Sequence, residues 1–450
     1  MIGTVTLDGA HEVFCRWLGA DYDTQALDAV LAAAAVEQLD GDPLWLLLLS
    51  GSGNAKTETV QALSGAGAVS VSTVSSEGAL LSATPQKDKA SDATGGLLRQ
   101  IGGRGVLVIK DVTSLLSMNR DMRSQVLGAL REVYDGRWTR SVGADGGRSL
   151  CWEGRIVLVG AVTTAWDSAR DVVAAMGDRF VVVRMDSHHG RQAAGRRAIG
   201  NTGSEELMRA ELAEAVGGVI ASMDTTPTTL TAEETDVLLA AADVVTLART
   251  GVEYDHRGDV IDAHAPEMPT RFAKQLAQVV RGSVAIGVSR AEALRLAIRC
   301  ARDSMPPLRL SIVDDLAKHP GSTTADIRKR INKPRNTVDR QLQALHMLGV
   351  LDCREEEATY GESTRTRWFY SLADNIEPRS LDPARVPDLS VDTPNPREKK
   401  ARRDESPRPS TDKSGTHGGV CPHGHDMRDG PCSLCDTAKW NRHLLEEVRS

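Results

Sequence analysis

A short glycine-rich segment carries residue types that bind nucleotide phosphates. Residues 50–57 read Ser-Gly-Ser-Gly-Asn-Ala-Lys-Thr and follow the apolar run 44–49. In such a loop small residues let backbone N–H groups surround phosphate oxygens, a lysine reaches the β- and γ-phosphates, and a threonine hydroxyl ligates Mg²⁺. The spacing predicts a site for ATP and Mg²⁺ made by Gly51, Ser52, Gly53, Asn54, Ala55, Lys56 and Thr57.

The loop departs from the usual pattern, which has glycine where Ser50 and Ala55 stand. Alanine before the lysine is sterically mild unless that position requires a positive φ angle. The competing interpretation is a Gly/Ser loop followed by an unrelated Lys-Thr pair. Context favours the phosphate loop, because residues that suit nucleotide chemistry follow two later apolar runs.

These two runs end in an acid and in hydroxyl groups. The run 105–109 leads to Asp111, and a carboxylate at a strand end there is placed to hold Mg²⁺ or orient water. The run 155–160 leads to Thr163 and Thr164, whose hydroxyls can contact a γ-phosphate or an attacking water. The competing interpretation of Asp111 is a simple cap at the end of a strand.

Two arginines complete the series. Arg179 lies in Gly-Asp-Arg-Phe, and Arg271 lies in Met-Pro-Thr-Arg-Phe at a predicted helix start. In this order the motifs resemble those of AAA+ ATPases, and the spacing is most similar to the branch of minichromosome-maintenance helicases and bacterial enhancer-binding activators. The resemblance covers residues 20–300. It implies these roles: phosphate and Mg²⁺ binding for Lys56 and Thr57, Walker B for Asp111, sensor 1 for Thr163 or Thr164, arginine finger for Arg179, and sensor 2 for Arg271.

The Walker B motif departs from this family. The family has Asp-Glu, in which the aspartate holds Mg²⁺ and the glutamate activates water, whereas this chain has Lys110-Asp111. In one alignment Lys110 replaces the metal-binding acid and Asp111 is the base. In the other Asp111 is the metal-binding acid, and Val112 leaves no base. Because loss of a general base lowers a rate by about 10²–10⁴-fold, slow hydrolysis and a nucleotide-binding switch are both open.

An arginine finger also implies an oligomer, because such a residue stabilises the transition state in a neighbouring subunit. If Arg179 has this role, the protein forms a homo-oligomer, either a ring or a dimer. The competing interpretation is a surface arginine paired with Asp178.

A basic cluster lies further along the chain. Between 328 and 340 there are six basic residues and one acid. The surrounding pattern predicts helices at 311–319, 323–331 and 334–348 and a hairpin with strands at 351–353 and 367–372. Three helices and a hairpin resemble a winged helix-turn-helix, in which the third helix enters a DNA groove. The predicted DNA contacts are Arg328, Lys329, Lys333, Arg335, Asn336, Arg340, Arg365 and Arg367. The competing interpretation is a protein-binding winged helix, since the run 355–357 is Glu-Glu-Glu.

The C-terminal segment has the spacing of a zinc site. The segments Cys421-Pro-His-Gly-His425 and Cys432-Ser-Leu-Cys435 each supply a pair of candidate metal ligands. Zinc prefers four tetrahedral nitrogen and sulfur ligands. The predicted Zn²⁺ ligands are Cys421, His425, Cys432 and Cys435, with His423 or His443 as substitutes for the fourth. The competing interpretation is an unstructured tail with free thiols.

The elements that must position these groups alternate in type. Apolar runs at 44–49, 105–109, 155–160 and 179–184, separated by helical stretches, predict an α/β fold with a parallel sheet. The stretch from 205 to 303 has all-helical periodicity, and 376–420 is a predicted disordered linker that holds 7 of the 18 prolines. The predicted domains are an AAA+ core with N-terminal helices at 1–204, a helical lid at 205–303, a winged helix at 307–372, the linker at 376–420 and a zinc element at 421–437.

Composition excludes several classes of protein. The 450 residues are 41% hydrophobic and 26% charged, with a net charge of −7, which predicts a globular protein without a basic coat for nucleic acid. No apolar run approaches the length of a membrane span, no leader opens the chain, and seven cysteines suit a reducing cytoplasm.

Together these features, with the resemblance, predict an AAA+ ATPase that remodels DNA as an accessory helicase or replication initiator, for example of a mobile element. The alternatives are a transcription regulator whose DNA binding is controlled by nucleotide, and a protein-binding scaffold with vestigial nucleotide binding.

Overall fold

The computed structural model describes residues 5–84, 93–143, 147–169, 179–360 and 363–386. All of them belong to one compact unit, Met1–Val391. The predicted zinc element, and the predicted linker from residue 387 onwards, lie outside the described residues.

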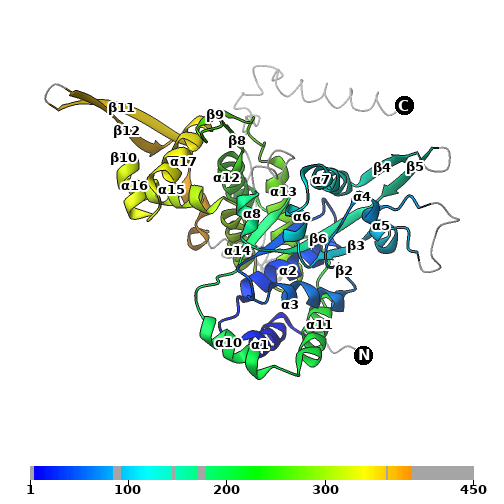
Figure 1. The fold of residues 1–450 in the computed structure, drawn as a ribbon. Helices are drawn as coiled ribbons and strands as arrows, with labels where there is room; N and C mark the ends of the chain where they lie inside the picture. Colours follow the sequence, from blue (N-terminus) through cyan, green and yellow to red (C-terminus); the bar gives the residue numbers. More distant parts are fainter. Residues whose placement is uncertain (1–4, 85–92, 144–146, 170–178, 361–362, 387–450) are drawn as a thin grey trace, which may run out of the picture. The chain divides into compact units, whose positions relative to one another are not determined.

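A five-stranded parallel sheet forms the centre of this unit (Figure 1), in the order β2-β3-β6-β1-β7. Its strands are β1 (Trp45–Leu49), β2 (Val69–Val71), β3 (Arg104–Ile109), β6 (Arg155–Val162) and β7 (Val181–Arg184). The four predicted strands are all present, and the α/β class with a parallel sheet is confirmed. The strand that sequence analysis missed, β2, has only three residues and a polar residue at its centre.

Alternate residues of β1 pack into two separate hydrophobic cores. Leu46 and Leu48 lie in the core shared with α2 (Thr24–Val36). Leu47 and Leu49 lie in the core on the other face of the sheet, with α7 (Arg120–Tyr134). Both faces are therefore covered, which explains why the strand reads as a continuous apolar run.

The other described helices of this part pack on the sheet or on one another. They are α1 (Leu7–Leu18), α3 (Lys56–Gln61), α4 (Glu77–Leu80), α5 (Leu97–Ile101), α6 (Thr113–Leu116), α8 (Ala165–Ser168), α10 (Arg191–Gly200) and α11 (Glu205–Ala221), with a 3-10 helix at Ala62–Ala66. A hairpin of β4 (Arg137–Val142) and β5 (Arg148–Glu153), which sequence analysis missed, lies between α7 and β6. None of the helices within the described ranges is long and apolar enough to cross a membrane.

Sequence analysis predicted that the stretch 205–303 is all-helical, and this prediction is wrong. It contains α12 (Ala232–Arg249), α13 (Thr270–Ala285) and α14 (Arg290–Asp303), but also a hairpin of β8 (Val252–Tyr254) and β9 (Val260–Ala263). The hairpin escaped notice because its strands are shorter than the windows that reveal periodicity. α14 covers the free edge of β7, where the Ser304 hydroxyl and the Asp303 carboxylate accept backbone N–H bonds from Val182 and Arg184, each at 2.9 Å.

Residues 307–372 form three helices and a small antiparallel sheet. The helices are α15 (Pro307–Lys318), α16 (Thr324–Arg330) and α17 (Arg335–Met347), and the strands are β10 (Ser322–Thr323), β11 (Leu351–Tyr360) and β12 (Ser363–Leu372), in the order β10-β12-β11. The three predicted helices and the predicted hairpin are present, with longer strands than expected.

The prediction that a disordered linker begins at residue 376 is wrong. Two 3-10 helices, Pro378–Leu381 and Pro383–Arg385, occupy the segment 376–386. Leu381 is 1% exposed and belongs to the main hydrophobic core. The proline content suggested disorder, but a few apolar side chains are sufficient to anchor this short segment on the protein.

A single arginine closes the turn that leads into β1. The guanidinium of Arg155 donates to the backbone carbonyls of Val36, Glu37, Gly41 and Asp42 at 2.5 to 3.2 Å. It thereby satisfies the end of α2 and the following turn, where helix carbonyls lack partners.

Replacing Arg155 with methionine should lower the free energy of unfolding by about 2 to 4 kcal/mol, because several carbonyls lose a charged donor at once. Urea denaturation measures this change. The matched control is Arg137→Met, which removes an exposed arginine paired with exposed Glu153 and should cost less than about 0.5 kcal/mol. Equal effects of the two substitutions would contradict this role of Arg155.

Candidate nucleotide site

The predicted phosphate loop, residues 50–57, joins the carboxyl end of β1 to the start of α3. Lys56 opens α3 and is 8% exposed. Its Nζ atom donates to the carbonyl oxygens of Ser50 at 3.1 Å and Gly51 at 2.6 Å, so the loop curves around the ammonium group. Burial lowers the pKa of Lys56, and the negative charge of Asp111 opposes this effect. The side chain of Thr57, the next residue, is exposed. The loop thus holds one buried cation beside one free hydroxyl.

Ala55 has a φ angle of +54°, in the left-handed region. The sequence left open whether this position needs a positive φ, and the structure shows that it does. An alanine in this region is strained because its Cβ approaches a backbone oxygen, whereas glycine adopts the same angles freely. The departure from the usual pattern at this position therefore carries a conformational cost.

Replacing Ala55 with glycine should raise the free energy of unfolding by about 0.5 to 1 kcal/mol, since relief of strain exceeds the entropy that glycine adds to the unfolded chain. The converse substitution, Gly53→Ala, places alanine at a φ of +77° with open space around it and should lower stability by about 1 kcal/mol. Thermal unfolding of both variants tests the prediction, which fails if Ala55→Gly is destabilising.

Asp111 and Thr163 belong to one chain of polar contacts across neighbouring strand ends. Asp111 follows β3 and accepts the backbone N–H of Thr113 at 2.9 Å. The Thr113 hydroxyl lies 3.2 Å from the Thr163 hydroxyl and accepts the Thr163 backbone N–H at 3.2 Å. Because β6 lies between β1 and β3, Thr163 is placed between the phosphate loop and Asp111. Thr164 instead opens α8 without a capping side-chain bond. Sequence analysis missed Thr113, although an acid two residues before a threonine is a common turn signal.

The neighbours of Asp111 bear on how the Walker B motif aligns. Val112 is 4% exposed and lies in the hydrophobic core. An added Cβ at Gly160 would come 2.7 Å from Val112, so this valine is tightly packed against β6. Asp111 is also the acid whose charge acts on Lys56. This geometry fits the alignment in which Asp111 is the metal-binding acid and the next residue supplies no base.

A cavity of about 520 Å³ adjoins the phosphate loop. This volume lies in the range of small-molecule and cofactor sites. Its walls include Trp17 and Tyr22 near the end of α1, Met185 after β7, and Ala194 and Ala198 of α10. Sequence analysis missed this wall, because α10 has no buried residue and no apolar stripe that would reveal a helix. Figure 1 shows α10 beside α1.

The segment after β7 closes the phosphate loop from the other side. The backbone N–H of Gly51 donates to the Ser187 hydroxyl at 2.9 Å, and the Asn54 side chain donates to the Asp186 carbonyl at 2.9 Å. His189 bonds the Asp186 carboxylate and holds its pKa below the usual value. These residues were not predicted, since their link to the loop spans more than 130 positions of sequence.

Arg179 lies just before β7, at the ends of the strands opposite to those that carry the phosphate loop. Since Val181 pairs with Leu46, Arg179 is level with the amino end of β1, whereas the phosphate loop follows its carboxyl end. The five residues of β1 span about 16 Å at about 3.3 Å per residue. Arg179 therefore does not reach the phosphate loop of its own chain.

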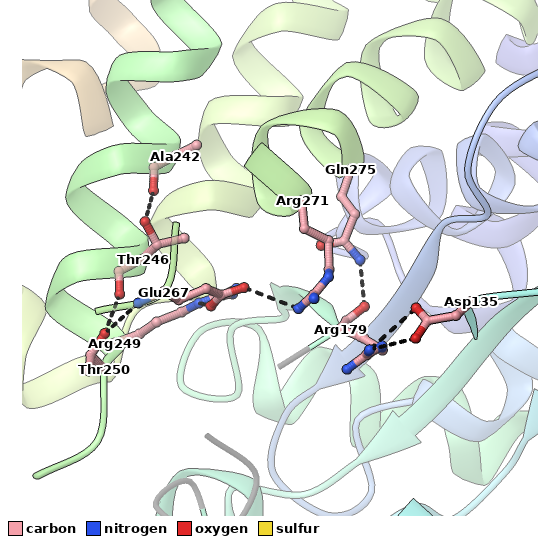
Figure 2. A network of polar contacts seen from close by, with 9 residues as sticks. All are labelled: Asp135, Arg179, Ala242, Thr246, Arg249, Thr250, Glu267, Arg271 and Gln275. Atoms are coloured by element: carbon pink, nitrogen blue, oxygen red, sulfur yellow. Dashed lines mark hydrogen bonds and ion pairs between the residues drawn. The ribbon is translucent and has the colours of Figure 1, made fainter. Parts of the chain in front are cut away.

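Arg179 is held rigidly, and the interpretation as a surface arginine is wrong. Its side chain is 8% exposed and bonds Asp135 at 3.0 Å (Figure 2). The guanidinium also lies over the Tyr134 ring, 5.5 Å from the ring centroid. Asp135, at the end of α7, is one partner of Arg179; the predicted pairing with Asp178 is not tested, because Asp178 lies outside the described residues.

Arg271 lies beside Arg179 rather than beside the phosphate loop. One helical turn later in α13, the Gln275 side chain donates to the Arg179 carbonyl at 2.5 Å. The positive charge of Arg271 contributes to lowering the pKa of Arg179, after the larger effect of burial. Glu267 links Arg271 at 3.6 Å to the buried Arg249 at 2.7 Å (Figure 2). The two arginines from sequence analysis thus lie together, away from the residues around Lys56.

The predicted DNA contacts fall into two groups. Lys329, Lys333, Arg335, Asn336 and Arg367 are exposed and Arg328 is partly so, whereas Arg340 donates to a backbone carbonyl of the β8–β9 turn. Arg365 lies in β12 opposite Ala358, and its side chain is not described. In β11 of the β11–β12 hairpin, Glu355 and Glu357 alternate with Arg354 and Glu356, which pair with each other at 2.6 Å. Glu355 and Glu357 therefore lie on the face of the hairpin opposite to the face that carries Arg354.

Within the described part of the chain, no group of three or more His, Cys, Asp or Glu side chains is arranged to hold a metal ion. The predicted zinc ligands Cys421, His425, Cys432 and Cys435 lie outside that part. Cys300 is buried and Cys15 is partly buried, which suits structural thiols.

No protein-family model matches the sequence, and no curated protein matches it at a significant level.

Proposed function

We propose that this protein is an AAA+-type ATPase that acts on DNA. The observation that carries the proposal is the buried Lys56, enclosed by a glycine-rich loop where β1 meets α3, with Asp111 and Thr163 at the ends of the next two strands. Backbone N–H groups at such a junction bind phosphate, and the cavity beside α10 offers room for the nucleoside.

The residues around the loop would have separate roles in binding the nucleotide. Lys56 supplies positive charge to the phosphates, and Thr163 positions a water or a γ-phosphate oxygen. The exposed Thr57 and Asp111 fit Mg²⁺, which needs few protein oxygens when phosphates bind it as well. Bound there, Mg²⁺ would neutralise charge on the phosphates.

Arg179 and Arg271 would act on the nucleotide of a neighbouring subunit. Both lie at the sheet edge opposite the phosphate loop, and Asp135 and Gln275 hold Arg179 in place. Arginines supplied by a second molecule stabilise phosphoryl transfer in other nucleotide hydrolases. The proposal therefore includes a homo-oligomer with composite sites.

Residues 307–372 would bind DNA as a winged helix. Their three helices, the hairpin and the exposed basic residues at the start of α17 support this assignment. Arg309 joins this part to the helical bundle: it is 4% exposed and donates to the carbonyls of Ala248 and Thr250 and to the side chain of Gln341 in α17, at 2.7 to 2.9 Å. Movement of α12 would thus be passed to α17.

A second candidate is a nucleotide-controlled regulator with little or no hydrolysis. It is favoured by the buried Val112 after Asp111, which leaves the position of the usual catalytic base without a carboxylate. In this case nucleotide binding alone would change the affinity for DNA.

Steady-state ATP turnover of the full chain, with and without duplex DNA, separates the candidates. Turnover that DNA stimulates supports the motor. ATP binding without turnover, together with preference for one duplex sequence, supports the regulator and contradicts the motor. Absence of DNA binding at low salt contradicts both and leaves a scaffold.

A further inference from the structure

The β8–β9 hairpin contacts the helix that we assign to the DNA groove. Arg340 of α17 donates from Nη2 to the carbonyl of Arg257 at 2.5 Å. The guanidinium lies so close to the turn that a Cβ added to Gly258 would be 2.8 Å from it. One residue further along α17, the Gln341 side chain donates to the Tyr254 hydroxyl at 3.4 Å. The hairpin therefore contacts the middle of α17.

The hairpin touches the side of α17 that carries the predicted DNA contacts. Residues three and four positions apart share a helix face, so Arg340 lies on the same face as Asn336 and Thr337. Both of these residues are exposed, as is Arg335. The first turn of this face is therefore open, whereas the arginine that continues it is bound by another part of the chain.

The charge of the hairpin opposes DNA. Residues 252–263 contain four acidic residues, Glu253, Asp255, Asp259 and Asp262, and one arginine, a formal charge of −3 with histidines neutral. Asp255 accepts the backbone N–H groups of Arg257 and Asp259, each at 2.8 Å, and so shapes the turn. DNA phosphates close to this turn would meet like charge, and Arg340 would be unavailable to them.

We infer that the β8–β9 hairpin is an autoinhibitory element, which covers part of the DNA-binding face of α17 and must move away before α17 enters a groove. The inference rests on the proposed DNA-binding function. The hairpin connects α12 to α13, so a shift of the helical bundle on nucleotide binding would carry it off α17. DNA affinity is thereby lowered by the cost of opening this contact.

Gly258→Asn tests the inference without changing any predicted DNA contact. The φ angle of Gly258 is +80°, a region that asparagine tolerates, and the new side chain would occupy the space of the Arg340 guanidinium. Fluorescence anisotropy with a labelled duplex, at fixed salt and on the full chain, should show an affinity on the order of tenfold higher than wild type. The matched control is Gly203→Asn, at a φ of +88° with nothing within 4 Å, which should bind like wild type.

A second variant changes charge and leaves the turn intact. Asp255→Asn, Asp259→Asn and Asp262→Asn together keep the side-chain carbonyls that shape the turn, and they should also raise affinity. Hydrogen exchange of the wild-type amides at 252–263 should become faster when duplex binds, since the hairpin leaves α17.

Three results would overturn the inference. Equal affinity of wild type and both variants shows that the contact does not inhibit. Weaker binding of Gly258→Asn, or slower exchange at 252–263 in the complex, shows that the hairpin belongs to the DNA interface. If neither wild type nor the variants bind duplex at low salt, the proposed DNA function fails and the inference falls with it. If wild type and the variants bind duplex with the same affinity, the inference of autoinhibition fails while the proposed DNA-binding function stands.

Discussion

Lys56→Ala should lower ATP affinity by about 30- to 1000-fold, the equivalent of about 2 to 4 kcal/mol. Lys56 is the buried cation at the centre of the phosphate loop, and its partners in this structure are the loop carbonyls of Ser50 and Gly51. Phosphate oxygens would form charge-assisted hydrogen bonds with the same ammonium group in a site partly shielded from water. Isothermal titration with a non-hydrolysable ATP analogue measures the loss, and turnover should disappear with it.

The same substitution should leave the free energy of unfolding within about 1 kcal/mol of wild type. Burial lowers the pKa of Lys56, so the folded protein holds this charge at a cost. Loss of the cation removes that cost along with its two hydrogen bonds. The control Lys274→Ala removes an exposed lysine that pairs with Asp42 at 3.1 Å, and its ATP affinity should equal that of wild type. Normal ATP affinity of Lys56→Ala would contradict the assignment of the loop.

Arg179→Ala should lower ATP turnover by about 10³-fold or more, while leaving ATP binding by its own chain intact. The reason is the position of Arg179 at the sheet edge opposite the phosphate loop, from which it can act on a neighbour's nucleotide. Loss of the contacts with Asp135 and the Tyr134 ring should also cost stability, about 1 to 3 kcal/mol by urea denaturation. Turnover is therefore measured well below the unfolding temperature of the variant.

Mixing of subunits separates action on a neighbour from loss of structure. Arg179→Ala and Lys56→Ala chains are each inactive, but an equimolar mixture should regain about a quarter of wild-type turnover, because a quarter of the interfaces join an intact loop to an intact arginine. The control mixture of Lys56→Ala with Asp111→Asn should regain nothing, since both residues serve the same side of a site. No recovery in the first mixture, with both variants folded and oligomeric, would contradict a role of Arg179 between subunits.

Local signals in the sequence were sufficient to predict four of the five strands of the parallel sheet and the glycine-rich turn that follows β1. The run 44–49 is apolar throughout because both faces of β1 are buried, and the glycines that follow mark the turn into α3. Lys56 and Thr57 could be placed because the chemistry of a phosphate loop depends on residues within eight positions of one another. The helices of 307–372 were likewise visible from their apolar spacing.

Local sequence patterns could not predict the backbone conformation of the loop or the contacts between residues distant in sequence. That Ala55 adopts a positive φ follows from how the loop turns between β1 and α3, not from the residue itself. The wall of the cavity includes α10, whose helical residues are all exposed and so leave no periodic signal. Two hairpins were also missed. The strands β8 and β9 have only three and four residues and so resemble loops, whereas β4 and β5 have six residues each but carry several charged and polar side chains.

The sequence by itself determined which chemical groups this protein has and on which local elements they lie: a lysine and a threonine at a glycine-rich turn, an acid and threonines after later strands, and a basic helix. Only the tertiary structure decided which of these groups meet. The strand order brings Thr163 between Lys56 and Asp111. The parallel register of β7 on β1 places Arg179 level with the amino end of β1, beside Arg271 (Figure 2), and Arg340 donates to the β8–β9 turn. The physical reason is that secondary structure depends on neighbours in sequence, whereas packing joins residues tens to hundreds of positions apart.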